Sequence, residues 1–258
     1  RSLPRLFAMQ RTRPYLISLS LLTLALLLSV AFGAVVIPLG TVARLFVGGF
    51  PGFGWLLSGA DIPSSFMTIV YRIRLPHTAL VALTGAALAG SGAAYQGLFR
   101  NPLADPYLIG VASGAGLGAV LVMSVAPFTA YFFGMFTIPA GAFVGALLTV
   151  VVVYSLARSG GAAPTTTLIL AGVAVGSFAS AVTSFLMLRS QGELRRALAW
   201  LLGGASLSGW EPVLAALPYV LLGLGVLAFS GHALNVLQVG DVQAQQWGLR
   251  VERVRAIL

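Results

Sequence analysis

The chain has 258 residues, of which 58% are hydrophobic and only 8% are charged, and its mean hydropathy is +0.96. A soluble globular protein carries roughly 25% charged residues, so the composition excludes a water-soluble globule and indicates an integral membrane protein. The formal net charge of +9 comes from 15 arginines, with no lysine, against 6 acidic residues. These arginines are spread singly between apolar runs, which favours anchoring at lipid headgroups over binding of nucleic acid.

Stretches without acidic or basic residues predict the membrane spans, because about 20 apolar residues are needed to cross the hydrocarbon core. The first begins at Pro14, after four arginines, and its length favours a transmembrane helix over a signal peptide. The longest, Pro106–Ala157, is sufficient for two spans, with a break expected at Ala126-Pro127. Six helices are therefore predicted, at approximately residues 16–38, 78–99, 108–125, 138–157, 167–188 and 212–230.

Two connections between these spans are expected to lie at the membrane interface. Residues 39–71 contain the run GGFPGFG, whose glycines and proline oppose a spanning helix, and Trp55 follows as an aromatic anchor. We expect this loop on the outer, periplasmic side. Residues 192–210 include the short amphipathic stretch LRRALAWLL, with Trp200 and Trp210 suited to an interface.

The distribution of arginines predicts a cytoplasmic N-terminus. With that orientation nine arginines fall inside and six outside. The outer ones are Arg44, Arg72, Arg74, Arg189, Arg195 and Arg196. Six arginines on the outer side are more than the positive-inside rule favours, which suggests that some of them have a function there.

Motifs of soluble enzymes are missing from the sequence. It contains no P-loop, dinucleotide fingerprint, zinc-protease motif or nucleophile elbow. Its two histidines are far apart and no cysteine accompanies them, so neither a metal site nor a cofactor bound by this chain is predicted. No ionisable residue lies deep inside a predicted span, which counts against a proton-coupled carrier.

Small residues repeat at every fourth position in several predicted helices. They are Gly110, Gly114 and Gly118, then Gly172 and Gly176, and also Gly85 and Ala89. Such faces allow helix backbones to approach closely in lipid, so we favour helix packing over ligand binding as their role.

Several collinear blocks resemble one known family. They are RLP at Arg74–Pro76, GAALAGSG at Gly85–Gly92, QGLFRNPLADP at Gln96–Pro106, GVASGA at Gly110–Ala115, LILAGVA at Leu168–Ala174, WLLGG at Trp200–Gly204, NVLQVGD at Asn235–Asp241 and WGLRVERVR at Trp247–Arg255. Their order and spacing are similar to those of the permease subunit of type II ABC importers, the FecCD type, which serves iron–siderophores, haem and cobalamin.

The resemblance implies an all-α polytopic permease domain over residues 1–258 that works as a homodimer. Its implied partners are two ATPase subunits, which carry ATP and Mg, a periplasmic or lipid-anchored substrate-binding protein, and membrane lipid. The expected substrate is an iron chelate of the iron–siderophore class, with haem or cobalamin as alternatives. Family members have ten helices, so the domain is expected to be incomplete at its C-terminus. A secondary transporter or channel built on broken helices is the alternative of another class.

The turn between the second and third predicted spans is the first candidate site. Its two prolines stop helices, and Asn101 and Asp105 are suited to cap the flanking helix ends. The resemblance further implies a cytoplasmic gate formed by Asn101 and Leu103 together with Thr165 and Thr166.

Residues 239–256 form a polar, basic segment that follows the sixth span. Its pattern alone would fit an interfacial amphipathic helix with a break at Gly248. The resemblance implies a cytoplasmic segment that couples to the ATPase. The residues expected to take part are Asp241, Gln245, Gly248, Arg250, Glu252 and Arg253.

The third candidate site lies at the outer end of the second span. Arg74 and Arg72 precede Pro76, and the resemblance implies that this place receives acidic residues of the binding protein. The family has a second arginine where this chain has His77, so Arg72 is expected to supply the missing charge. The alternative is that both arginines reach toward lipid headgroups.

Overall fold

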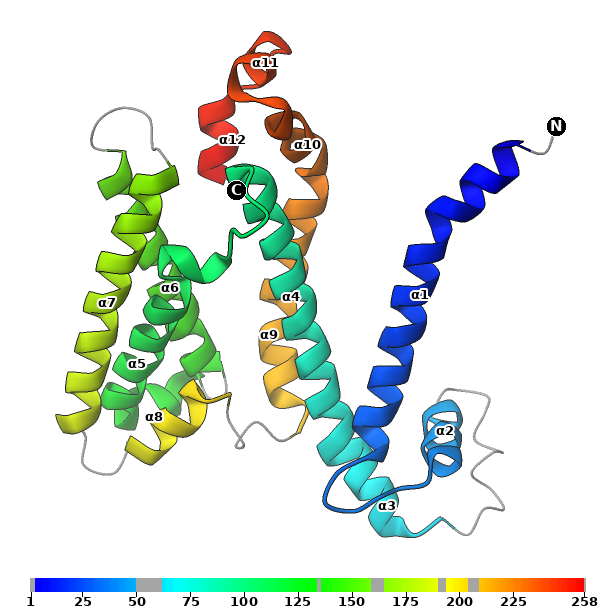
Figure 1. Cartoon of the computed structure of the whole chain (residues 1–258). Coiled ribbons are helices and arrows are strands. Elements are labelled where there is room, and N and C mark those ends of the chain that lie inside the picture. The colour runs from blue at the N-terminus through cyan, green and yellow to red at the C-terminus, as the bar shows by residue number, and fades with distance from the viewer. Residues whose placement is uncertain are drawn as a thin grey trace. The chain divides into compact units, whose positions relative to one another are not determined.

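The computed structural model describes residues 3–49, 62–133, 136–158, 165–189, 194–203 and 209–257. These residues are largely helical and include no strand, which confirms the predicted all-α class (Figure 1). In chain order the elements are α1 (Leu3–Ala31), α2 (Leu39–Gly48), α3 (Ser64–Thr68), the π-helix η2 (Ile69–Arg74), α4 (Leu75–Phe99), the 3-10 helix η3 (Pro106–Ile109), α5 (Val111–Phe133), α6 (Thr137–Ala157), α7 (Thr165–Arg189), α8 (Leu194–Leu201), α9 (Glu211–Phe229), α10 (Gly231–Val239), α11 (Asp241–Gln246) and α12 (Val251–Ile257).

Five described segments are long and apolar enough to cross a membrane. They are Arg13–Ala31, Ser64–Phe99, Thr137–Ala157, Thr166–Arg189 and Glu211–Phe229. The remaining predicted span, at residues 108–125, corresponds to α5, which continues to Phe133 and passes through the expected break at Pro127. A proline removes one backbone hydrogen bond, and membrane helices tolerate that loss without ending. The cytoplasmic placement of the N-terminus stays a prediction.

The connection expected as a loop over residues 39–71 is partly helical. In α2 the positions Val42, Leu45 and Gly48 are buried, and their spacing of three places them on one face. A second helical stretch begins at Ser64 and continues without interruption into α4. Of the run GGFPGFG that motivated the loop, Gly48 and Gly49 belong to the end of α2, and the rest of it, with Trp55, lies outside the described residues.

The chain divides into two compact units. The first comprises residues 1–82 and 208–213. Its core gathers the end of α1, the segment after it, α2 and η2. The buried residues of that core are Val30, Ala31, Ile37, Val42, Leu45 and Val70.

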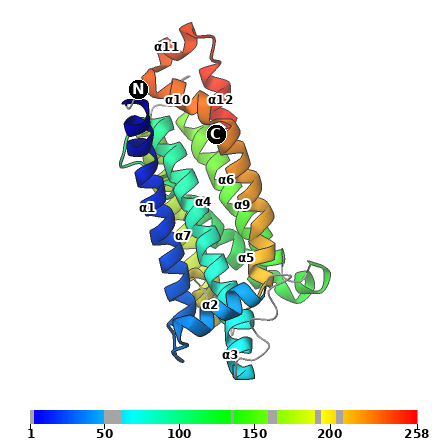
Figure 2. The same ribbon diagram turned by 90° about the vertical axis from the view of Figure 1, so that its right-hand side faces the viewer.

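The second unit comprises residues 83–207 and 214–258. Within it, α5, α6 and α7 pack together, and Ala197 of α8 joins their core beside Val120 and Met123. The remainder of α4 runs beside α9, where Gly90 faces Leu224. Both views show α11 and α12 beyond the last turn of α4 (Figures 1 and 2).

Candidate gating, coupling and docking sites

The predicted glycine face of α5 lies directly against α6. A Cβ atom on Gly118 would lie 2.1 Å from the carbonyl oxygen of Gly141, and one on Gly114 would lie 2.7 Å from that of Gly145. Real Cβ atoms do not approach so closely, so only glycine permits this contact between backbones. Sequence reasoning missed Gly141 and Gly145, although they show the same four-residue repeat.

The glycines of α7 face the segment that leads into α5. A Cβ atom on Gly172 would lie 2.2 Å from the carbonyl oxygen of Leu108, and one on Gly176 would lie 3.0 Å from the hydroxyl of Ser113. Gly110 has a φ of 77° between η3 and α5, a conformation that favours glycine. These glycines therefore serve close packing among α5, α6 and α7.

In the turn after α4, Asp105 caps η3 as predicted, whereas Asn101 bonds within the turn instead of capping a helix end. The Oδ1 atom of Asn101 accepts a hydrogen bond from the backbone N–H of Leu103 at 3.0 Å, and Oδ1 of Asp105 accepts from Tyr107 at 2.7 Å. The side chain of Leu103 is 84% exposed. The turn thus presents an apolar side chain on a framework that is fixed by its own polar residues.

The other two predicted gate residues lie at the start of α7. Thr166 is exposed there, whereas the side chain of Thr165 lies outside the described residues. The η3 segment meets α7 at Gly172, six residues after Thr166, which corresponds to about 9 Å along a helix axis. A gate formed by all four residues stays a prediction.

The α10–α12 segment has one buried face and one exposed face. Leu237, Ala244 and Val251 form a buried cluster, against which Leu98 of α4 packs. The opposite face exposes residues of the predicted coupling set together with two large apolar side chains. Its exposed members are Val242, Gln245, Trp247, Gly248, Arg250 and Arg253.

The predicted coupling set also includes Glu252 and Gly248. The side chain of Glu252 lies outside the described residues. Gly248 separates α11 from α12 with a φ of 84°, so the break predicted at this glycine is present and has the backbone conformation that favours glycine.

Asp241 differs from the exposed coupling residues, because its carboxylate is occupied within the chain. Nη2 of Arg255 donates to both carboxylate oxygens at 3.0 Å, and Arg100 Nη2 lies 3.7 Å from Oδ1. This residue therefore holds the segment together rather than belonging to its free surface.

Arg74 is also occupied, which changes the expected docking site. Its Nη1 donates to the carbonyl oxygens of Val30 at 2.7 Å and Ala31 at 2.9 Å, and its Nη2 donates to that of Val35. The last carbonyls of a helix lack partners within it and carry partial negative charge, so a guanidinium binds them well. Arg74 caps the end of α1, and its guanidinium group is not free to receive an acidic residue.

Arg72 and His77 are exposed and remain the candidates for docking. Arg72 borders a hollow of about 590 Å³. Its lining residues are Tyr71, Arg72, Gly209, Trp210 and Glu211. Because both Arg72 and Glu211 line it, the hollow carries both signs of charge.

One hydrogen bond beside this hollow depends on the π-helical turn of η2. In this turn the N–H of Leu75 bonds the carbonyl of Val70, and the fifth residue after Tyr71 is Pro76, which has no N–H. The Tyr71 carbonyl is therefore available, and the indole Nε1 of Trp210 donates to it at 3.1 Å.

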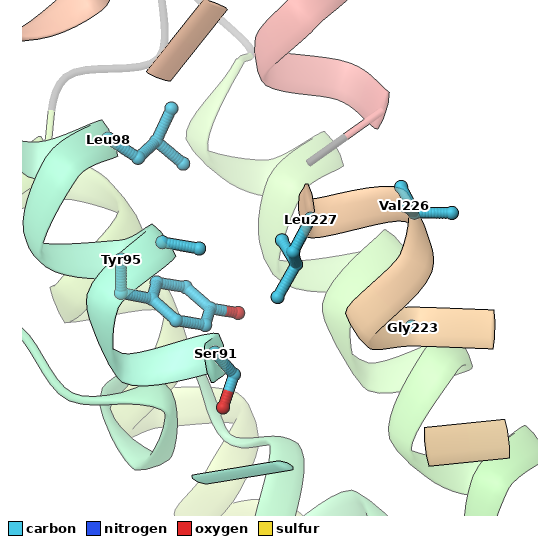
Figure 3. A pocket seen from close by; sticks show the side chains of 7 residues that line it. Ser91, Tyr95, Leu98, Gly223, Val226 and Leu227 are labelled. Atoms are coloured by element: carbon cyan, nitrogen blue, oxygen red, sulfur yellow. The ribbon is translucent and has the colours of Figure 1, made fainter. Parts of the chain in front are cut away.

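A second hollow, of about 330 Å³, lies between α4 and α9 (Figure 3). Ser91, Tyr95 and Leu98 line one side, and Val226 and Leu227 lie opposite (Figure 3). Its walls are mostly apolar, with two hydroxyl groups. Among the described residues no group of three or more His, Asp or Glu side chains could hold a metal ion.

Long apolar helices joined through glycine, with a polar segment after the last of them, define an all-helical, multi-pass membrane protein. Residues 21–258 match the FecCD transport family. The chain belongs to this family of ABC importer permeases, and its membrane is the cytoplasmic membrane.

Three relatives illustrate the range of the family. The chain is 43% identical over 197 residues to the cobalamin import system permease protein BtuC of Halobacterium salinarum, which covers 76% of this chain and 52% of the relative. It is 38% identical over 249 residues to the ABC transporter permease protein YvrB of Bacillus subtilis, and the match covers 96% of this chain and 69% of the relative. It is 37% identical over 193 residues to the hemin transport system permease protein HmuU of Yersinia pestis, covering 71% and 55%.

A solved structure shows the same fold. It is a metal-chelate type ABC transporter in an inward-facing conformation, with a TM-score of 0.71 and 26% sequence identity, covering 94% of this chain and 70% of that one. The chain therefore spans between about half and 70% of the length of the proteins compared with it.

Proposed function

We propose that this chain is the membrane-spanning part of an importer that uses ATP to take up a bulky metal chelate, with an iron–siderophore as the expected substrate. Cobalamin is the second candidate, because a 43% identical relative is a cobalamin permease. Haem is a third, on the strength of the HmuU relative. The family match over residues 21–258 carries the proposal.

The proposed assembly is a homodimer with two ATPase subunits and a substrate-binding protein. Nucleotide would bind to the ATPase pair, and its binding would shift an equilibrium between outward- and inward-facing states. The exposed face of α11 and α12 would contact the ATPase. A polar, basic face that carries an exposed Trp247 and Val242 supports this role, since aromatic side chains are enriched at protein interfaces.

The remaining sites complete the proposal. Asn101, Leu103, Thr165 and Thr166 would narrow the cytoplasmic end of the pathway. Arg72, with His77 nearby, would receive an acidic side chain of the binding protein on the outer side. The exposure of Leu103 and of Arg72 supports both assignments.

Uptake into proteoliposomes tests the function. The chain would be reconstituted with the ATPase subunit and the substrate-binding protein that co-purify with it from its native membrane, with ATP inside and a labelled ferric siderophore, cobalamin or haem outside together with the binding protein. We expect uptake of one substrate that requires ATP and persists when ion gradients are collapsed. Uptake that follows an ion gradient without ATP would instead identify a secondary transporter.

A further inference from the structure

The last turn of α4 is attached to the α10–α12 segment by three neighbouring contacts. Leu98 packs on the cluster that contains Leu237 and Ala244. Gly97 faces Gln238, whose Nε2 would lie 3.2 Å from an added Cβ. Arg100 then pairs with Asp241 at 3.7 Å. A displacement of the segment would therefore reach α4 at the point where the 100–105 turn begins.

Asp241 is the shared member of two ion pairs. Its pair with Arg255, at 3.0 Å, joins the first residue of α11 to α12 and closes the segment on itself. Its longer pair with Arg100 joins that closed segment to the turn. All three side chains are between 25% and 45% exposed, so both pairs are accessible to water and can be broken without burying an unpaired charge.

The backbone at Arg100 is unusual. Its φ of 51° is the only positive value at a non-glycine residue in the part of the chain that the structure describes. The N–H of Asn101 bonds the carbonyl of Gln96 at 3.2 Å, which is the helix-ending pattern that ordinarily places glycine at position 100. An arginine is disfavoured in this conformation, so its presence indicates a use for the side chain.

We propose that Asp241, through Arg100, is the link by which movement of the α11–α12 segment positions the 100–105 turn. The proposal rests on the proposed function, in which that segment contacts the ATPase and the turn belongs to the gate. Arg255 keeps α11 and α12 together so that they move as one piece. Arg100 carries the displacement into Asn101, its neighbour, and so to Leu103.

The test places a reporter on the turn. In the complex with its co-purified ATPase, a Leu103→Cys chain is labelled with a membrane-impermeant thiol reagent, with and without a non-hydrolysable ATP analogue. The ratio of the two labelling rates is measured for the parent, Arg100→Gly and Arg100→Lys. Glycine suits the backbone at this position, so Arg100→Gly removes the charge without disturbing the end of the helix.

We expect Arg100→Gly to reduce the nucleotide-dependent ratio by about two- to fivefold, the range set by a partly exposed ion pair. Arg100→Lys should restore most of it, because the charge returns. Co-purification with the ATPase should be unchanged in both variants. Arg158→Gln is the matched control, since Arg158 also follows a helix, is exposed and forms no ion pair among the described residues.

The outcomes separate this link from the proposed function. If the parent's labelling does not respond to nucleotide, the gate and the link are both overturned. If the parent responds and Arg100→Gly responds equally, the link alone is overturned. If Arg100→Gly loses its ATPase, Arg100 serves docking and the link is again overturned.

Discussion

Two contacts within the second unit are built on different principles. The α5–α6 contact brings backbone against backbone, with Gly118 beside Gly141 and no charged group between them. The junction of α4 with α10–α12 uses one apolar cluster and an ion pair of 3.7 Å that remains partly exposed. A contact between two backbones allows a single arrangement, whereas the two charged groups of a solvated ion pair can reorient about each other and stay paired. The α5–α6 contact is therefore suited to hold two helices rigidly together, and we call it the fixed frame. The junction of α4 with α10–α12 is suited to relative movement, and we call it the joint.

The largest effect is expected where the fixed frame is disturbed. Gly118→Ala should destabilise the protein by about 3 kcal/mol, because its Cβ would meet a carbonyl of α6 that cannot rotate away. Gly85→Ala is the control, since nothing lies within 4 Å of a Cβ there, and it should be neutral or stabilising by up to about 1 kcal/mol. Unfolding in detergent mixtures of rising SDS fraction, followed by circular dichroism, measures both. Equal stability of the two variants would contradict the close approach of the α5 and α6 backbones at Gly118.

Substitution of Arg74, which caps α1, tests whether a charged group can also hold part of the structure rigidly. Arg74→Ala should cost about 2 kcal/mol, because it leaves carbonyls of Val30 and Ala31 without a partner. Arg72→Ala, two residues away and exposed, should change the stability by less than about 0.5 kcal/mol. The same unfolding measurement applies. A larger loss from Arg72→Ala would mean that the cap has been assigned to the wrong arginine.

At the joint, two substitutions of one residue should differ. Arg100→Gly is expected to be about 1 kcal/mol more stable than Arg100→Ala, because both lose the ion pair but only glycine suits the positive φ. Differential scanning calorimetry of the two purified variants gives the difference. If alanine proves as stable as glycine, the backbone at position 100 is not strained.

The smallest effect concerns the indole of Trp210. Trp210→Phe removes the donor to the Tyr71 carbonyl while keeping an aromatic ring, and it should cost about 0.5 kcal/mol because water can replace a partly exposed donor. Hydrogen exchange of the backbone around residues 69–74 should rise in this variant. Unchanged exchange there would indicate that the hydrogen bond contributes nothing to the turn.

The sequence predicted the parts of this fold that depend on local pattern. Apolar length located the spans, and the cap of Asp105 on η3 followed from residue type and spacing alone, whereas Asn101 bonds inside the turn and not at a helix end. The glycine repeat on α5 was recognised because a period of four lies on one helix face. Its partner face on α6 shows the same period at Gly141 and Gly145, so that omission was avoidable.

Other features depend on residues that are distant in the chain. Arg74 reaches carbonyls about forty residues earlier, and Asp241 reaches Arg100, more than a hundred residues away. No local period signals either pairing, because an arginine near a helix end has the same pattern whether it meets a carbonyl, a lipid or a partner protein. The α2 helix was missed for another reason, since the nearby glycines and proline outweighed its short apolar face.

The π-helical turn of η2 makes the length of one segment matter more than its side chains. Each residue added to or removed from a helix rotates what precedes it by about 100°. Deleting Arg72 or Ile73 would turn the Tyr71 carbonyl away from Trp210 and its phenol away from the Leu45 carbonyl that it binds. The face of α4 beyond Pro76 would keep its orientation. A change in the length of η2 alone would thus break the hydrogen bonds that attach α2 and the residue before α9 to this helix.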